Sequence, residues 1–359
     1  MKLRSLGCAL LAVGLLGSGQ VASAAATEAA TTAAAACTWK PTALGAGTAV
    51  SAKVTATDDK GNFAGWALPT DQFGDTVRAA SWTNGTYADL GTPGYNGAAV
   101  TAENRSGTVA GTAYSTIFGA GFIYEKAFKS SGGTLVALPF PTASQLPAGY
   151  TRSAAVGITD SGDVIGVVRK QDGTGLTAVR WPAAQPGTVT LLTGAPSSGI
   201  GPVAVDTDGA ILLNSSDIWR DGTLTHLGTL PGLKYAWPDD IKNGRVVGYG
   251  VYNGKNVGVY WDQQHAAHIL PKSSYNLSNG NPQFSINASG LITGRVDEAN
   301  GGNDLAGTGY GVWNQGTFVS KFGDLKADLP VVVGDDGTVG GYRYDSTTRH
   351  STAYLWRCS

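Results

Sequence analysis

The sequence has few of the residues that most often carry catalysis. Its 359 residues include four His, three Cys and one Met, and only 14% are charged. Neither a phosphate-binding loop, a dinucleotide fingerprint nor a G-x-S-x-G nucleophile elbow occurs. No segment longer than about ten residues keeps a helical period, so a helical fold is excluded. The net charge of −1 gives no reason to expect nucleic acid or a membrane surface as a partner.

Only one apolar run is long enough to attract attention, and it lies at the N-terminus. Lys2 and Arg4 precede an apolar stretch over residues 6–16, and Ala22-Ser23-Ala24 forms an A-x-A cleavage site. This pattern predicts a signal peptide over residues 1–24 and a secreted, extracellular protein. The Ala/Thr-rich residues 25–36 are predicted to be a disordered leader or a pro-segment. Cleavage of the signal peptide would remove Lys2 and Arg4 and change the net charge from −1 to −3.

The remaining chain, residues 37–359, contains a unit that recurs seven times. Each unit has an apolar stretch, a polar turn that ends in Gly, a second apolar stretch, a loop and an aromatic. A period of about 40–50 residues is typical of β-propellers. The sequence therefore predicts an all-β protein, a single seven-bladed β-propeller of four-stranded antiparallel blades. The turn glycines and the aromatics are Gly61, Gly107, Gly162, Gly209, Gly244, Gly290 and Gly337, and Trp82, Phe128, Trp181, Trp219, Trp261, Trp313 and Trp356.

The two ends of the repeat region predict how the ring closes. The C-terminus supplies only three strands of the last blade, over residues 329–333, 338–342 and 352–356. The segment 39–45 ends in Leu-Gly, as fourth strands do elsewhere, so we expect it to complete that blade in a one-plus-three closure. Cys37 and Cys358 flank this junction, and two cysteines left in a secreted protein normally pair. The alternative is two free thiols.

Three segments carry a resemblance to a known family. They are Leu-Gly-Thr-Leu-Pro-Gly at 227–232, Ser-Ile-Asn-Ala-Ser-Gly at 285–290 and Val-Val-Gly at 246–248. The chain resembles the secreted bacterial HAF-repeat family over essentially all of residues 37–359. That resemblance implies a propeller and not a reaction. It is also similar to a kind of secreted propeller that acts on an extracellular metallopeptidase without being an enzyme.

The ionisable residues do not indicate an active site. Carboxylates precede the turn glycines at equivalent repeat positions, where short polar side chains stabilise turns, whereas an active site would break the symmetry. His265 and His268 form H-x-x-H without a third zinc ligand. The acidic stretch 297–304 fails the EF-hand spacing, which leaves a flexible loop or a calcium site. We predict no catalytic residue, no metal, no cofactor and no enzyme. The turn carboxylates are Asp58, Asp59, Asp160, Asp206, Asp208, Asp335 and Asp336.

A partner is expected on the face of the ring that carries the long loops between the second and third strands and between blades. Aromatic side chains on such loops form recognition surfaces, although they can also fold down onto the blades. The sequence thus predicts a secreted, non-catalytic, monomeric propeller that binds another secreted protein; the resemblance implies a metallopeptidase. The alternative is a polymer- or carbohydrate-acting enzyme or lectin-like binder, which would need non-repeating ionisable groups at the ring centre. The predicted partner-binding residues are Phe73, Tyr95, Phe118, Phe140, Tyr150 and Tyr275.

Overall fold

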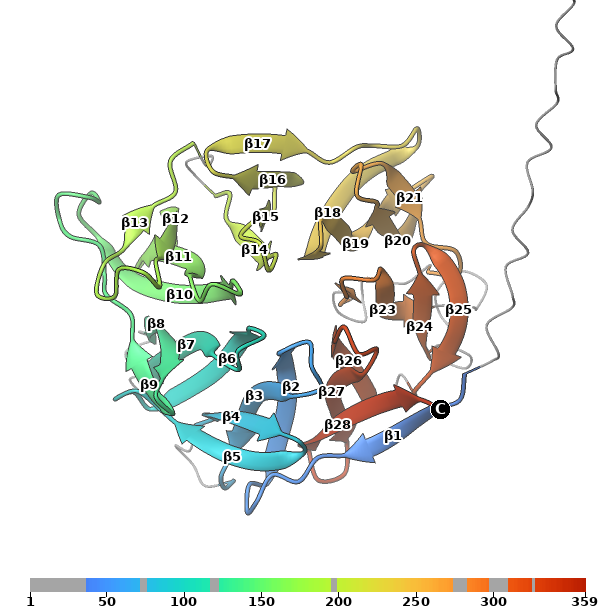
Figure 1. The fold of residues 1–359 in the computed structure, drawn as a ribbon, viewed down its shortest axis with the longest axis horizontal. Helices are drawn as coiled ribbons and strands as arrows, with labels where there is room; N and C mark the ends of the chain where they lie inside the picture. Colours follow the sequence, from blue (N-terminus) through green and yellow to red (C-terminus); the bar gives the residue numbers. More distant parts are fainter. Residues whose placement is uncertain are drawn as a thin grey trace, which may run out of the picture. The chain divides into compact units, whose positions relative to one another are not determined.

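The computed structural model describes residues 37–71, 76–116, 123–194, 199–273, 283–296, 309–324 and 327–359. Every strand in these ranges belongs to one of seven four-stranded antiparallel sheets, which form a ring (Figure 1). The predicted seven-bladed β-propeller is confirmed. In these ranges no helix is long and apolar enough to cross a membrane.

The first four blades follow one another along the chain, each running from the ring centre to the rim. Blade 1 contains β2 (Ser51–Thr57), β3 (Phe63–Leu68), β4 (Arg78–Thr83) and β5 (Thr86–Gly91). Blade 2 contains β6 (Gly97–Glu103), β7 (Val109–Thr116), β8 (Ile123–Ser131) and β9 (Thr134–Ala137). Blade 3 contains β10 (Tyr150–Ile158), β11 (Val164–Lys170), β12 (Leu176–Trp181) and β13 (Thr190–Leu191). Blade 4 contains β14 (Pro202–Val205), β15 (Ile211–Leu213), β16 (Asp217–Arg220) and β17 (Thr223–His226).

The last three blades continue this order, and the seventh takes its outer strand from the N-terminus. Blade 5 contains β18 (Leu233–Lys242), β19 (Arg245–Tyr252), β20 (Lys255–Trp261) and β21 (Ala267–Ile269). Blade 6 contains β22 (Ser285–Ile286), β23 (Leu291–Val296), β24 (Gly309–Asn314) and β25 (Thr317–Phe322). Blade 7 contains β26 (Asp328–Val333), β27 (Val339–Asp345), β28 (His350–Cys358) and β1 (Trp39–Ala43).

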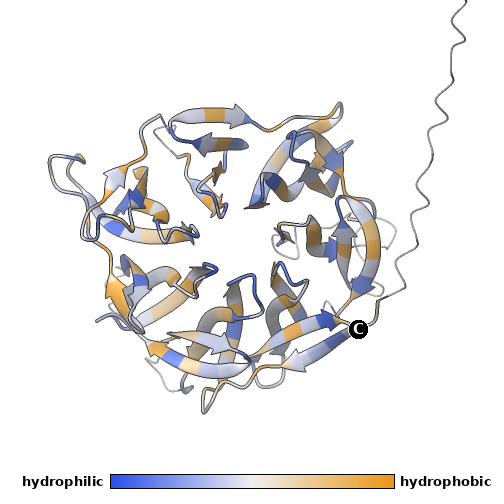
Figure 2. Cartoon of the chain, in the orientation of Figure 1, coloured by the Kyte–Doolittle hydropathy of each residue, from blue (hydrophilic) through white to orange (hydrophobic). Residues whose placement is uncertain are grey.

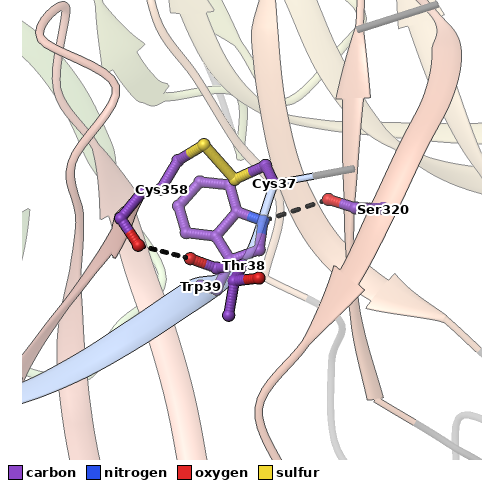
Figure 3. The surroundings of a disulfide bond; sticks show 6 residues. Cys37, Thr38, Trp39, Ser320 and Cys358 are labelled. Carbon is purple, nitrogen blue, oxygen red and sulfur yellow. Dashed lines mark hydrogen bonds between the residues drawn. A yellow bond between two sulfur atoms is a disulfide. The ribbon is translucent and has the colours of Figure 1, made fainter. Parts of the chain in front are cut away.

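The ring closes as the sequence predicts. Strand β1 pairs antiparallel with β28, from Trp39 opposite Cys358 to Ala43 opposite Tyr354. The Cys37–Cys358 disulfide joins residues 321 positions apart, with 5.4 Å between their Cα atoms. Beside it the Trp39 indole Nε1 donates a hydrogen bond to Ser320 Oγ of blade 6 at 3.0 Å (Figure 3). Covalent, backbone and side-chain links therefore all act at one junction.

The recurring aromatic of the third strand packs in the wedge between blades. Trp82, Phe128, Trp261 and Trp313 are fully buried. The indole Nε1 of Trp261 donates to Gly228 O, in the segment that follows the fourth strand of the preceding blade, at 2.8 Å. A large apolar side chain with one satisfied donor can thus hold two sheets together. The equivalent hydrogen bond, from the indole Nε1 to a backbone carbonyl that follows the fourth strand of the preceding blade, is made by Trp82, Trp181, Trp219 and Trp313.

Hydrophobic residues recur along the strands of every blade, and the hairpin turns nearest the ring centre are largely hydrophilic (Figure 2). The apolar side chains of the strands therefore pack into the cores between blades, and the polar residues lie at the inner turns. The ring centre is consequently the place where polar groups from seven blades can meet.

Candidate functional site

The innermost strands enclose a cavity of about 370 Å³ at the ring centre. All seven inner strands contribute side chains to its lining, from β2 through β26. We call this cavity the channel. Because seven separate segments converge on it, it brings together residues that are up to 278 positions apart, as Thr55 and Val333 are.

A β-bulge at the same place in six inner strands determines which residues face the channel. In β2 the register of pairing with β3 skips Thr55, between Val54 and Ala56. A bulge re-aims the extra side chain and bends the strand. It also brings the Lys53 carbonyl against Gly65 of β3, where a Cβ would clash, which explains a recurring second-strand glycine. The skipped residues, all of which line the channel, are Thr55, Thr101, Val156, Val203, Asp239 and Val331.

Three acidic residues in the channel break the sevenfold repeat. Asp239 is the only charged residue in the bulge set above. Glu103 pairs with Val109 at the end of its inner strand, and Asp240 follows the bulge of blade 5. The residues that correspond to Glu103 are Thr57, Ile158, Val205, Ile241, Ile286 and Val333, and those that correspond to Asp240 are Ala56, Ala102, Gly157, Ala204, Ser285 and Val332.

A fourth carboxyl group, that of Asp59, lies at the turn after β2 and has an unusual partner. Lys242 at the end of β18 places its Nζ 2.7 Å from Asp59 Oδ2, and the two side chains are 17% and 3% exposed. Asp59 belongs to blade 1 and Lys242 to blade 5, so this ion pair spans the channel. Asp59 also has a positive φ of 64°, a conformation that Asp tolerates better than most residues. We refer to Asp59, Glu103, Asp239 and Asp240 as the channel carboxyls.

Further charges surround the same mouth of the channel. Arg105, on the turn after β6, pairs with Asp335 on the turn of blade 7 and lies 3.8 Å from Asp160 of blade 3. On the short-turn face, which carries the turns between first and second strands, ion pairs therefore join blade 1 to blade 5, and blade 2 to blades 3 and 7. Charge pairing holds this mouth together.

Burial raises the pKa values of the channel carboxyls. Burial, with repulsion from Asp58 and Asp59, raises the pKa of Glu103 to about 8. Burial, reinforced by Asp240 and opposed by the Phe284 N–H, raises that of Asp239 to about 8. Both are therefore largely protonated at neutral pH and can donate protons.

The other two channel carboxyls hold hydrogen-bonding partners. Burial raises the pKa of Asp59 to about 6 against the attraction of Lys242, so Asp59 is ionised at pH 7. Burial would lower the pKa of Lys242, but Asp59, Asp240 and Asp335 outweigh it and raise it. Burial also raises the pKa of Asp240, which accepts hydrogen bonds from Ser285 Oγ at 2.9 Å and Ile286 N at 3.0 Å. Asp240 thus joins blade 5 to blade 6.

The turn carboxylates that obey the repeat have the structural role expected of them. Asp58 Oδ1 accepts hydrogen bonds from the backbone N–H groups of Lys60 and Asn62, within its own turn. Asp206 accepts from the N–H groups of Asn243 and Gly244, in the turn of the next blade. In the described ranges, no three or more His, Cys, Asp or Glu side chains are placed to hold a metal ion.

The histidines lie apart from the channel. His268 pairs with Asp262 at 2.9 Å, His226 with Asp217 at 2.8 Å and His350 with Asp71 at 2.8 Å. Each pair is exposed or partly exposed, and the His350–Asp71 pair joins blade 7 to blade 1. No histidine cluster forms in the described structure. The acidic stretch 297–304 lies outside the described residues.

The predicted partner-binding aromatics are only partly described. Tyr95, Phe140 and Tyr150 are each partly buried and pack against the core between blades. Lys126 Nζ lies 5.1 Å from the Phe140 ring centre and Lys170 Nζ 5.8 Å from that of Tyr150. A role in binding remains a prediction for all six residues. Phe73, Phe118 and Tyr275 lie outside the described residues.

An exposed aromatic stack on the long-loop face was missed by the sequence analysis. Tyr235 and Trp237 on β18 are 60% and 38% exposed. Their ring centres are 5.8 Å apart, and the Trp237 ring lies 5.2 Å from that of Tyr249 on β19. These residues lie at the end of β18 opposite Lys242, on the face where a partner was expected. The alternation Tyr235-Ala236-Trp237 was the available signal, because residues two apart on a strand share a face.

Comparison with known proteins supports the fold. No family model matches the chain, and no curated protein matches it. Among solved structures, the β-propeller domain of the Trilobed protease from Pyrococcus furiosus is similar at 10% identity and a TM-score of 0.50, over 86% of this chain and 94% of that one. An oligogalacturonate lyase in complex with manganese is similar at 12% identity and a TM-score of 0.50, over 90% and 96%.

A third similar structure is a larger enzyme. Pyrococcus horikoshii acylaminoacyl peptidase matches at 12% identity and a TM-score of 0.48, over 82% of this chain. The present chain spans half the length of that peptidase. At these identities the likeness shows the propeller fold alone.

The prediction that the chain is not an enzyme is wrong on two grounds. Two solved structures that share its propeller fold are a domain of a protease and a lyase, so the fold itself does not argue against an enzyme. The prediction also rested on the lack of a non-repeating ionisable set at the ring centre, and Glu103, Asp239 and Asp240 form such a set. Glu103 was overlooked because only carboxylates at the turns were compared between blades.

Proposed function

We propose that this propeller is a secreted recognition protein that binds another extracellular protein through its long-loop face. The observation that carries the proposal is the exposed stack of Tyr235, Trp237 and Tyr249. Tyr and Trp are enriched among the residues that dominate binding energy at interfaces, because they bury a large area at low cost in conformational entropy. The stack is held on two paired strands, which fixes its geometry before a partner arrives.

The rest of the face supports the same proposal. Near the start of β2, Lys53 Nζ lies 3.9 Å from the ring centre of Tyr342 and 5.1 Å from that of Trp66. These aromatic side chains and Tyr344, which is 37% exposed, add to the contact area. A stable interface needs roughly 800 Å² from each partner, which two-residue turns on the opposite face cannot offer. The similarity to a kind of secreted propeller that acts on an extracellular metallopeptidase favours a secreted metallopeptidase as the partner.

The test is recovery of a partner from the culture fluid of the producing organism by the full chain. We expect Tyr235→Ala combined with Trp237→Ala to weaken binding at least tenfold. As the control, Asn84→Gly changes the short-turn face and keeps the positive φ of 50° that Asn84 adopts. Equal binding by the wild type and the stack variant would refute the proposal. Leu224→Ser, on the exposed outer strand β17, tests for a general effect of surface apolar residues.

A second candidate function is acid-assisted cleavage of a polymer or carbohydrate in the channel. It is favoured by Glu103, whose pKa of about 8 suits a general acid at neutral pH. Ionised Asp59 beside it would supply the contrasting carboxylate that such chemistry uses. Turnover of oligosaccharides that is lost in Glu103→Gln would support this candidate, and a panel without turnover would reject it.

A further inference from the structure

The channel holds more acid than base. Among the described residues, five carboxyl groups line it, and Lys242 is the single cationic side chain. Lys242 is paired with Asp59, and Asp160 lies beside Arg105 at the rim. In this part of the chain, Glu103 has no salt-bridge partner, nor do Asp239 and Asp240. The five acidic residues are Asp59, Glu103, Asp160, Asp239 and Asp240.

Two carboxyl oxygens in the channel also lack a hydrogen-bond donor. Asp59 is 6% exposed, and its Oδ1 is buried without a partner in the described structure, as is Glu103 Oε2. Both groups line the channel, and the charge of Asp59 contributes to raising the pKa of Glu103. Buried acceptors without donors lower the stability of the native state and are uncommon. They point to a ligand that brings both donors and positive charge.

The structure narrows the kind of cation. Within the described ranges no set of acidic or imidazole ligands is arranged around a metal position. A primary ammonium offers three N–H donors and a guanidinium five, which can satisfy carboxyl oxygens from different strands. The cavity of about 370 Å³ falls within the range of small-molecule sites, roughly 300–1,000 Å³. We propose that the channel binds an organic cation, whose ammonium or guanidinium group contacts the channel carboxyls.

Binding should release a proton. A cation beside Glu103 stabilises its ionised form, so the proton of that carboxyl passes to the buffer. The charged groups around Glu103 are the other channel carboxyls, Asp58, Lys60 and Lys242, with Arg105, Asp160 and Asp335 at the mouth. Since burial holds Glu103 protonated below about pH 8, affinity should rise with pH by about tenfold per unit between pH 6 and 7 and less steeply toward pH 8.

The experiment is titration calorimetry of the full chain with n-butylamine and with agmatine at pH 7. Phosphate and MOPS buffers differ in ionisation enthalpy and neither is a primary amine, so the difference in measured heat counts the protons released. We expect close to one proton for each amine bound. n-Butanol, which has the same carbon chain without charge, serves as the ligand control.

Two matched acid-to-amide variants test the site. Glu103→Gln mimics the protonated acid, so it should fold normally, weaken amine binding at least tenfold and abolish proton release. Asp208→Asn removes an exposed turn carboxylate that is paired with Arg220 outside the channel, and should bind as the wild type does. Thermal unfolding of both variants shows whether either effect is merely loss of fold.

Two kinds of probe distinguish the source of the ammonium or guanidinium group. One is a free amine, n-butylamine or agmatine, and the other is a peptide with blocked ends and one internal Arg. Binding of the peptide would identify a basic side chain of a protein, and binding of amines alone a small metabolite; both support the site. The proposal is overturned if neither binds, if binding is the same in Glu103→Gln, or if calcium or neutral oligosaccharides bind in place of amines. It does not depend on the protein partner, because the stack on the long-loop face is untouched by these variants.

Discussion

Lys242 and Asp59 come from blades that are not neighbours, and their ion pair of 2.7 Å crosses the channel from blade 5 to blade 1. The pair is almost fully removed from water, so its two charges depend on each other. Most contacts in a propeller join adjacent blades, whereas this ion pair fixes the distance between two blades on opposite sides of the channel.

Lys242→Met should destabilise the protein by about 3 kcal/mol or more, because it leaves the Asp59 carboxylate buried without a counter-charge. Urea denaturation followed by Trp fluorescence measures the loss. Asp59→Asn, which tolerates the same positive φ, should restore part of the stability when combined with Lys242→Met. If the two losses simply add, the ion pair does not couple the blades as described.

The channel carboxyls predict that stability falls as the pH rises from about 4 to 8. Glu103 and Asp239 have pKa values of about 8 in the folded protein, above the values near 4 expected when unfolded. Between these values the folded state binds more protons than the unfolded state, so raising the pH favours unfolding. Thermal unfolding across this range should show a falling Tm, with a shallower slope in Glu103→Gln. A Tm that rises steadily to pH 8 would contradict these pKa values.

Removing the disulfide should cost stability without preventing folding. Cys37→Ser with Cys358→Ser frees a loop closure between residues 321 positions apart, for which the chain-entropy model gives about 6 kcal/mol as an upper value. Strand β1 still has five residues paired with β28, so blade 7 should still form. Dithiothreitol should lower the Tm of the wild type and leave that of the variant unchanged. An equal effect on both proteins would argue against the bridge.

The third-strand Trp residues allow a matched comparison. Trp261→Phe removes an indole donor from Gly228 O, whereas Nε1 of Trp356 has no acceptor in the described part of the chain. Trp261→Phe and Trp356→Phe leave similar cavities, but only Trp261→Phe also removes the donor from a partly buried carbonyl. We expect Trp261→Phe to be the more destabilising by about 1–2 kcal/mol in denaturant titrations. Equal losses would mean that packing alone holds the blades.

The fold could be predicted because its determinants are local and repeated. The Asn243-Gly244 turn or the buried Trp261 would be weak evidence alone, but seven spaced copies are specific to one architecture. The orphan strand at residues 39–43 and the two remaining cysteines then determined how the ring closes. The turn and strand motifs depend on residues that are neighbours in sequence, and the closure depends on the number of strands and cysteines. Motifs and numbers can both be read from the sequence without a structure.

The channel was missed because its chemistry depends on closure of the ring. Glu103 ends an ordinary strand in sequence, and only the convergence of seven strands removes it from water. A signal was present, since an acid at Glu103 stands where the other blades have Thr, Ile or Val. Asp239 was harder to recognise, because a bulge shifts the inner strand and hides which residue faces inward. The bulges themselves leave no clear mark in the sequence.

The recurring bulge places one residue from each of six blades at the channel. Some of these residues also contact the next blade, because Thr55 and Thr101 donate hydrogen bonds to Val100 O and Ala155 O, and Val203 packs against the core. Val203 in blade 4 and Asp239 in blade 5 show how different neighbouring members of this set can be. Single substitutions at these six positions can therefore change the chemistry of the channel lining. The same scaffold is suited to acquiring specificity for a different ligand, by mutation or by design.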